Sequence, residues 1–358
     1  IFKLVIIKYM KNKKTSLIGQ SLDDFIKICE AYDVKSFRAE QIFNWVYKNK
    51  VSDFKAIKNI PKDFINRLKK DYKIHSLNFV RSTQSNSELT NKFLFKTQNG
   101  SLIESVLMKE GERVTLCLST QVGCALDCKF CATAKMGFIE NLNPGEILDQ
   151  YLLISKNLKN PITNIVFMGM GEPFLNYANV IKAANLLHDP NGINIGYKRI
   201  TISTAGIVKR IEQFSKEGQK FKLAISLNGT TNDQRLSIMP VTKKNSLKNL
   251  LSASKKYTEY SNMWLTFEYV LIKDCNDTIE DAGRLIKILT GIKKCKLNII
   301  PYNPTDGTFQ RPDDNQIKVF MRKLNRAPFP VTIRWSKGTG IDAGCGQLVT
   351  SENLINAL

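Results

Sequence analysis

The sequence predicts an α/β fold in which a parallel sheet, either open or curled into part of a (β/α) barrel, follows a small helical domain. Beyond Gly111, six apolar strand-like segments alternate with six segments of helical periodicity, the pattern of successive strand–helix units. In either form of the sheet, reactive groups are expected just beyond the carboxyl ends of the strands. The 358 residues suffice for one large core with a small appended domain.

The first part of the chain has the sequence signals of helices. Ser21, with Asp24 three residues later, predicts a capping box at the start of a first helix. A second helix fits residues 37–47, and Pro61 is suited to the first turn of a third helix through Leu68. We expect a small basic domain that either packs against the rest of the protein or contacts phosphates.

A short β meander and then the alternating units follow this domain. The dipeptide Asn99-Gly100, between apolar residues 93–95 and 102–107, predicts a hairpin. Strands are predicted at 114–120, 162–168, 199–203, 222–227, 265–271 and 296–300. Helices are predicted at 144–158, 177–187, 207–216, 246–257, 278–289 and 315–324.

The charge balance favours an acidic macromolecular partner. Lys and Arg number 53 against 32 Asp and Glu, a formal net charge of +21, and nucleic acid is the first candidate. A general basic bias of the source proteome would give the same charge, because the lysines are spread over the whole chain. No apolar run approaches the length of a membrane span. Residues 1–15 form a basic extension that does not resemble a secretory signal, and we hypothesise that the native start is Met10.

Four of the eight cysteines crowd into fifteen residues, which predicts metal or redox chemistry in a reducing cytoplasm rather than a disulfide scaffold. Cys124, Cys128 and Cys131 follow a predicted strand with the spacing Cys-x3-Cys-x2-Cys. Three thiolates on one loop can hold three irons of a [4Fe–4S] cluster and leave the fourth open to a chelating ligand. The alternatives are chance and a zinc site, but zinc takes four ligands, and neither His75 nor His188 is near the triplet in the sequence.

The triplet, with Phe130 just before its third cysteine, resembles the signature loop of radical S-adenosylmethionine (SAM) enzymes. The sequence Gly171-Glu172-Pro173, at the end of the second predicted strand, resembles the motif with which that superfamily binds the amino group of SAM. A carboxylate beside glycines suits a cationic amine, since glycine lets the backbone approach a ligand closely. The resemblance implies a [4Fe–4S] cluster, SAM and a partial (β/α)6 barrel.

Three longer segments, 115–123, 171–177 and 341–348, are similar to the RlmN-type adenine C2 RNA methyltransferases, and the resemblance covers nearly all of the chain after Ser16. It implies methylation of C2 of an adenosine in 23S ribosomal RNA and, for some members, of the adenosine 3′ of the tRNA anticodon. Two SAM molecules would be used per turnover. The first methylates Cys345; the second yields a radical that activates this methyl group for addition to C2. Cys117 would then resolve the adduct through a transient disulfide with Cys345, and Glu104 would be the proton acceptor.

The resemblance also implies a set of SAM contacts at strand ends. These residues are Gly171, Glu172, Ser203, Ser226, Leu227, Asn228 and Asn303. The family often has His at the position of Asn228, which puts any charged role there in doubt because Asn cannot be protonated near neutral pH. Lys337 stands where Arg is common, which keeps a cation but loses a bidentate fork. Cys29, Cys275 and Cys295 match no motif and are predicted to be packing residues.

The organisation expected from these patterns has five parts. They are a basic N-terminal extension (1–15), a helical accessory domain that binds RNA (16–80), a β-meander linker (81–113), the radical SAM partial barrel (114–303) and a C-terminal extension (304–358) that carries Cys345. We expect a cytoplasmic monomer that binds RNA, is reduced by a flavodoxin or ferredoxin and has no membrane association.

Three other readings account for part of the sequence. A Cfr-type enzyme would use the same chemistry at adenine C8 and confer antibiotic resistance, although Asn176-Tyr177 after the Gly-Glu-Pro motif favours the C2 group. A non-catalytic RNA-binding protein with a structural cluster would explain the charge but not Cys345. An activase or a small-molecule radical enzyme would explain the triplet but not the basic helical domain.

Overall fold

In the computed structural model of this chain, the described residues are 14–85, 89–156, 158–305 and 307–350. Most of the predicted basic extension, with the hypothetical start at Met10, lies outside them. Among the described residues, no helix has the length and apolar character that crossing a bilayer requires.

A ten-stranded sheet forms the centre of the molecule, in the order β14-β13-β12-β11-β10-β9-β6-β5-β4-β3. The strands from β6 to β14 pair in parallel. Their bounds are β6 Arg113–Cys117, β9 Asn164–Phe167, β10 Ile200–Thr204, β11 Lys222–Ser226, β12 Leu265–Leu271, β13 Cys295–Pro301 and β14 Val331–Ile333. The two edge strands, β14 and β3, do not pair with each other, and residues from every strand of this sheet from β6 to β14 surround one cavity, so the sheet curls into a partial barrel. The predicted fold class is therefore confirmed, with β14 as an additional short strand.

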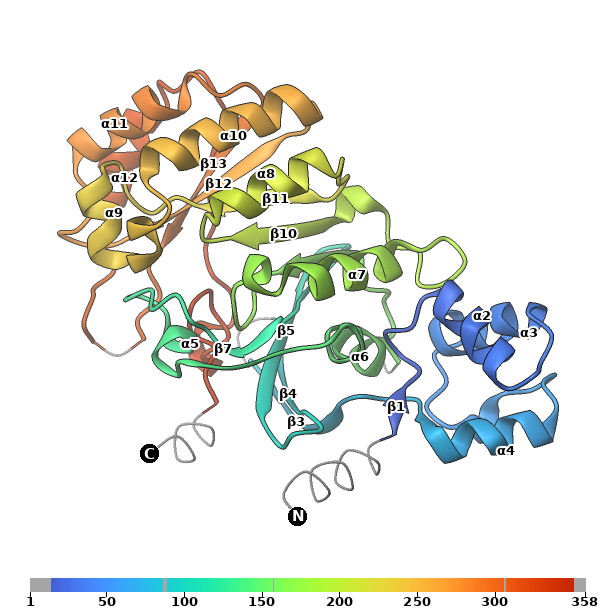
Figure 1. The fold of residues 1–358 in the computed structure, drawn as a ribbon. Helices are drawn as coiled ribbons and strands as arrows, with labels where there is room; N and C mark the ends of the chain where they lie inside the picture. The colour runs from blue at the N-terminus through green and yellow to red at the C-terminus, as the bar shows by residue number, and fades with distance from the viewer. Residues whose placement is uncertain (1–13, 86–88, 157, 306, 351–358) are drawn as a thin grey trace, which may run out of the picture.

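Helices cover the outer side of the parallel strands (Figure 1). They are α6 Pro144–Ser155, α7 Tyr177–His188, α8 Val208–Lys216, α10 Leu247–Ser261, α11 Ile279–Leu289 and α12 Asp314–Leu324. All six were predicted, and capping boxes at Asn143 and Thr278 fix the starts of α6 and α11. Shorter elements occupy the connections: α5 Ala132–Lys135, β7 Gln121–Gly123, β8 Phe138–Asn141, α9 Asn232–Ile238, and 3-10 turns at Pro173–Asn176, Tyr197–Arg199, Pro240–Lys243 and Thr339–Ile341.

The meander adds three antiparallel strands to the sheet beside β6. They are β3 Asn78–Gln84, β4 Thr90–Lys96 and β5 Leu102–Glu110. The hairpin predicted at Asn99-Gly100 joins β4 to β5. The sequence did not predict β3, because every residue of this edge strand is exposed and it has no alternation of apolar and polar residues.

The N-terminal helices form a separate layer at one side of the barrel (Figure 1). Their elements are β1 Thr15–Ser16, α2 Leu22–Ala31, α3 Phe37–Phe43, a π-helix Asn44–Lys48, a 3-10 turn Phe54–Ala56, α4 Lys62–Asp71 and β2 Tyr72–Lys73. The capping box of Ser21 and Asp24 is present. Pro61 occupies the N-cap position of α4 and not its first turn, because its backbone is still extended (ψ 129°).

One buried apolar core joins this helical layer to the barrel, since a single cluster runs from Leu17 to Leu348. Polar contacts hold the junction as well. The buried carboxylate of Asp149 on α6 accepts the Leu77 N–H at 2.9 Å and lies 2.6 Å from His75 Nδ1. The helical layer is thereby held in a fixed place beside the barrel.

Candidate active site

The three clustered cysteines lie on the loop between β7 and β8, at the carboxyl end of β6. Gly123, which ends β7, has φ +69°, and a Cβ there would lie 1.8 Å from the Gly137 carbonyl oxygen. Only glycine therefore permits this close pairing. The Cys124 N–H donates to the same carbonyl at 2.8 Å, and the Cys131 N–H donates to Cys128 O at 3.1 Å. The backbone thus folds the three cysteines into one turn.

The three thiols lie close enough to influence one another. Burial raises the pKa of all three, that of Cys124 to about 12, and the pKa of Cys128 is raised further by both other cysteines. Buried thiols of this kind become thiolates when they bind a metal. Among the described residues, no three His, Cys, Asp or Glu side chains are close enough to hold a single metal ion. A structural zinc ion takes four ligands, whereas each thiolate of a [4Fe–4S] cluster binds a different iron.

The C-terminal segment packs on this loop and brings Cys345 beside it. The Ala132 N–H donates to Gly346 O at 2.7 Å, directly after Cys131. Asn303, two residues after β13, donates through Nδ2 to Cys345 O at 3.0 Å and to Ser336 Oγ at 2.8 Å. The expected SAM ligand Asn303 therefore orients the Cys345 loop in this structure, and its contact with SAM stays a prediction.

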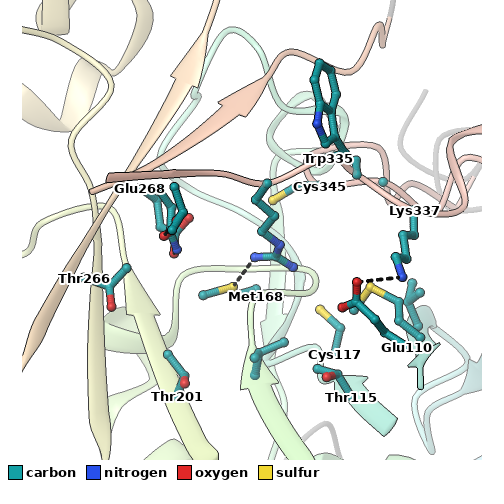
Figure 2. Close-up of a pocket in the computed structure, with 18 of the residues that line it drawn as sticks. Glu110, Thr115, Cys117, Met168, Thr201, Thr266, Glu268, Trp335, Lys337 and Cys345 are labelled. Atoms are coloured by element: carbon teal, nitrogen blue, oxygen red, sulfur yellow. Dashed lines mark hydrogen bonds and ion pairs between the residues drawn. The ribbon is translucent and has the colours of Figure 1, made fainter. Parts of the chain in front are cut away.

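A cavity of about 680 Å³ lies inside the partial barrel, and both Cys117 and Cys345 line it. Cys117 is the last residue of β6, and Cys345 comes from the C-terminal segment on the opposite wall (Figure 2). They are 228 positions apart in the chain. The structure thus brings together the two cysteines whose cooperation the resemblance implied.

Groups of both charge signs act on the two cavity thiols. Burial raises the pKa of Cys117 to about 12; Cys345 adds to this effect, and Arg334 opposes it. Cys345 is exposed at its surface, but the groups around its sulfur desolvate the thiol and raise its pKa; Glu268 adds to this effect, and Arg334 again opposes it. The Arg334 guanidinium, whose contact in the cavity is Met168 Sδ at 3.8 Å (Figure 2), is therefore the cation that favours both thiolates. All eight cysteines, each within the described residues, are free thiols.

Glu104 does not line this cavity. Its buried carboxylate accepts from Lys92 Nζ at 3.0 Å and from the Val349 N–H at 3.1 Å. Burial raises its pKa, and Lys92 lowers it. Glu104 thus ties β5 to the C-terminal segment, and its role as proton acceptor stays a prediction.

The other expected SAM ligands gather at the carboxyl ends of β9, β10 and β11. Gly171 has φ +94°, and a Cβ there would lie 2.4 Å from Gln121 Cβ. The buried Glu172 carboxylate accepts the Ala205 N–H at 2.7 Å and the Phe174 N–H at 3.0 Å, and burial raises its pKa. Ser203 and Ser226 lie near the ends of β10 and β11.

Leu227 and Asn228 follow β11 and are both buried. Asn228 has φ +52°, a conformation that asparagine tolerates better than most residues. Its Oδ1 accepts the Val270 N–H at 2.8 Å, so the side chain joins the end of β11 to β12. This contact is structural, and a direct contact of Asn228 with SAM stays a prediction.

The site agrees with comparisons to known proteins. The model of the Radical SAM superfamily matches residues 118–286, and that of the ribosomal RNA large subunit methyltransferase N-terminal domain matches residues 15–74. The chain is 40% identical to a probable dual-specificity RNA methyltransferase RlmN of Pseudothermotoga lettingae over 93% of its own length and 97% of the relative's. It is 41% identical to the corresponding protein of Thermotoga maritima over 95% and 97%. The chain belongs to the RlmN family of radical SAM RNA methyltransferases.

A solved structure supports the same assignment. A radical SAM methyltransferase from Sphaerobacter thermophilus matches with a TM-score of 0.90 at 38% identity, over 93% of this chain and 99% of that one. The family uses a [4Fe–4S] cluster and SAM. The helical layer of this RlmN-type enzyme is the part matched by the methyltransferase N-terminal domain.

Sequence reasoning missed Arg235 on α9, the largest of the fully buried side chains. Its Nε donates to Leu227 O at 2.9 Å, its Nη1 donates to Thr242 Oγ1 at 2.7 Å and its Nη2 donates to Ala205 O. Burial lowers its pKa to about 10, and Cys128 opposes the shift. In this RlmN-type enzyme Arg235 therefore clamps the two loops that carry the expected SAM ligands. No local pattern around residue 235 signals this role.

The cavity also has charged residues that the sequence did not single out. Glu268 on β12 and Asn298 on β13 lie in its wall, while Arg113, Lys222 and Lys296 lie at the amino ends of their strands. Burial lowers the pKa of Lys222, and Lys296 and Arg113 lower it further. The alternation of side chains along each strand could have suggested which of these residues face the cavity, because residues two apart on a strand face the same side.

Proposed function

We propose that this enzyme methylates C2 of an adenosine in 23S ribosomal RNA and also acts on the adenosine 3′ of the tRNA anticodon. The observation that carries the proposal is the cavity shared by Cys117 and Cys345 beside the loop of Cys124, Cys128 and Cys131. Support for two substrates comes from the dual specificity in the names of the relatives. The base must leave its stack to enter such a cavity, at a cost of about a few kcal/mol.

In this proposal the cysteines handle the methyl group. When bound, the cluster and SAM supply the radical that activates it. Cys345 carries the methyl group on its sulfur, and Asn303 holds the loop so that the sulfur faces the cavity. Attack of a Cys117 thiolate on the Cys345 sulfur would form a disulfide and break the carbon–sulfur bond; its electron pair would stay with the methylene carbon, which takes up a proton to become the methyl group of the released base. Glu104 is proposed to accept the proton from C2.

The expected ligands are part of the same proposal. Cys124, Cys128 and Cys131 would hold the cluster. Gly171, Glu172, Ser203, Ser226, Leu227, Asn228 and Asn303 would surround SAM. The five-part organisation is proposed with its boundaries at 15, 80, 113 and 303, with residues 16–80 contacting RNA. A cytoplasmic setting, a monomeric state and a flavodoxin or ferredoxin as reductant complete the proposal.

Anaerobic reconstitution followed by an assay on protein-free ribosomal RNA tests the function. We expect the wild type to produce 2-methyladenosine, seen by nucleoside mass spectrometry. We expect Cys345→Ala to bind the cluster as the wild type does and to make no methyladenosine, because the carrier sulfur is absent. Cys124→Ala should lose the [4Fe–4S] absorption.

Three results would contradict the proposal. Normal methylation by Cys345→Ala would exclude the carrier role of this cysteine. A full cluster in Cys124→Ala would exclude the assigned ligands. If 8-methyladenosine were the sole product, the enzyme would be of the Cfr type.

A further inference from the structure

A row of polar side chains, at the same register position on neighbouring strands, runs across one wall of the cavity. Ser226, Glu268, Asn298 and Thr332 are direct register partners across β11, β12, β13 and β14. Because partners in parallel strands point to the same face, the four side chains lie side by side. The last three line the cavity, and Ser226, an expected SAM ligand, adjoins Glu268.

Glu268 is the member of this row with an unfilled hydrogen-bonding capacity. Its side chain is only 6% exposed. Its Oε1 accepts from Asn298 Nδ2 at 3.0 Å. Its Oε2 is buried and has no hydrogen-bond partner among the described residues. A buried acceptor without a partner costs free energy, so its presence calls for a ligand that supplies the missing donor.

The position of Glu268 indicates which ligand that is. Its carboxylate and Cys345 line the same cavity. Figure 2 shows Glu268, Cys345 and Cys117 around the same cavity. The unfilled acceptor therefore belongs to the same cavity as the reacting sulfur, where the substrate base must lie under the proposed function.

The chemistry of adenine fits an acceptor at this place. Adenine presents an exocyclic amino group, a donor, next to ring nitrogen N1, and C2 is the carbon on the other side of N1. Enzymes that take a base out of its stack read it by hydrogen bonds to this edge. A site that holds C2 near Cys345 therefore brings the amino group within reach of the surrounding wall.

We propose that Glu268 selects the base: its free carboxylate oxygen accepts a hydrogen bond from the exocyclic amino group of the adenine that enters the cavity. This inference rests on the proposed function, because it takes an adenine as the substrate. It assigns Glu268 to recognition and not to the transfer of the methyl group.

The contact with Asn298 makes a Glu268→Gln variant informative. Asn298 donates to Oε1, so it holds the glutamine carbonyl oxygen at that position. The glutamine amide nitrogen then takes the place of Oε2 and turns the free acceptor into a donor. Such a donor opposes the amino group of adenine but matches the carbonyl oxygen at C6 of hypoxanthine.

The experiment uses an anticodon stem-loop with adenosine, purine riboside or inosine at the target position. Binding and methylation are measured for the wild type, Glu268→Gln, Glu268→Ala and the control Glu110→Gln. Glu110 lines the same cavity, but its carboxylate already pairs with Lys337 at 3.3 Å. Circular dichroism and thermal melting verify that each variant is folded.

We expect the wild type and Glu110→Gln to prefer adenosine to purine riboside by about ten- to a hundredfold, the loss that accompanies an unpaired buried acceptor. Glu268→Ala should treat these two bases alike, and Glu268→Gln should prefer inosine to adenosine. If Glu268 only supported the structure, its replacement would lower the binding and turnover of all three RNAs by the same factor.

Equal losses on all three RNAs, or a wild type that does not distinguish adenosine from purine riboside, would overturn the inference. The binding measurement distinguishes a failure of this inference from a failure of the proposed function. If the wild type discriminated in binding and the Glu268 variants changed that preference as expected, but no 2-methyladenosine formed, Glu268 would still be the selecting residue and the proposed reaction would be wrong.

Discussion

Cys345 and Cys117 face the cavity as thiols, although the thiolate is the form that accepts a methyl group or attacks a sulfur. Loss of solvation at the sulfur raises the pKa of both thiols; Cys345 adds to this effect on Cys117, and Glu268 adds to it on Cys345. Arg334 is the residue that acts in the opposite direction on both. The backbone N–H of Arg334 donates to Ile299 O at 2.8 Å, which fixes the residue beside β13. One arginine thus favours the reactive form of two cysteines.

Replacing Arg334 by Met should slow thiolate chemistry and move its pH profile upward. Without the cation, the pKa of Cys345 rises further, so a higher pH is needed for the same thiolate fraction. We expect alkylation of Cys345 by iodoacetamide, followed by peptide mass spectrometry, to slow about fivefold at neutral pH, as suits a partly solvated charge interaction on the order of 1 kcal/mol. Arg334→Lys should retain most of the rate, and the exposed Arg322→Met on α12 should not change it. An unchanged profile in Arg334→Met would refute this role.

At the scale of elements, α9 stabilises the strand ends through Arg235. The guanidinium satisfies carbonyls at Ala205 and Leu227, after β10 and β11. We expect Arg235→Ala to lower the free energy of unfolding by about 3 kcal/mol or more, because it leaves several buried acceptors unsatisfied. Urea denaturation measures this loss. Arg235→Lys should lose less, and the exposed Arg326→Ala is the control. A loss below about 1 kcal/mol would mean that water or neighbouring groups replace the guanidinium.

The elements also show what a sequence can predict. Periodicity and caps predicted the six main helices, and β12 has the predicted bounds, because most of its residues are apolar and nearly all are buried, with Thr266 and Glu268 as the polar exceptions. The exposed β3 and the three-residue β14 lack such a signal. In the site, spacing and the family resemblance predicted Cys117, Cys345 and the cysteine loop, and the structure brings Cys117 and Cys345 to one cavity. Arg235 and Glu268 could not be found in this way, since their roles depend on neighbours from other strands.

At the scale of the whole molecule, part of the net charge of +21 comes from cations that line the cavity at the amino ends of its strands. Arg113, Lys222 and Lys296 line the cavity at the amino ends of β6, β11 and β13, and both Lys222 and Lys296 reach solvent. Cys117 is the last residue of β6 and Glu268 lies midway along β12, so both are nearer the carboxyl ends of the strands than these cations are. A nucleotide whose base enters the cavity would therefore have its phosphates near these cations, provided that it enters from this end.

The salt dependence of RNA binding tests this direction of entry. Each phosphate contact on a single strand contributes about 0.7 to the slope of log K against log salt concentration. Lys222→Ala combined with Lys296→Ala should therefore reduce the slope by about 1.4 and weaken binding of all RNA sequences alike, because phosphates carry no base identity. The matched control is Lys255→Ala with Lys256→Ala, which removes the same charge from the exposed face of α10. If both pairs changed the slope equally, the cations would act only through the net charge. The RNA would then have to approach the cavity from the side of the C-terminal segment.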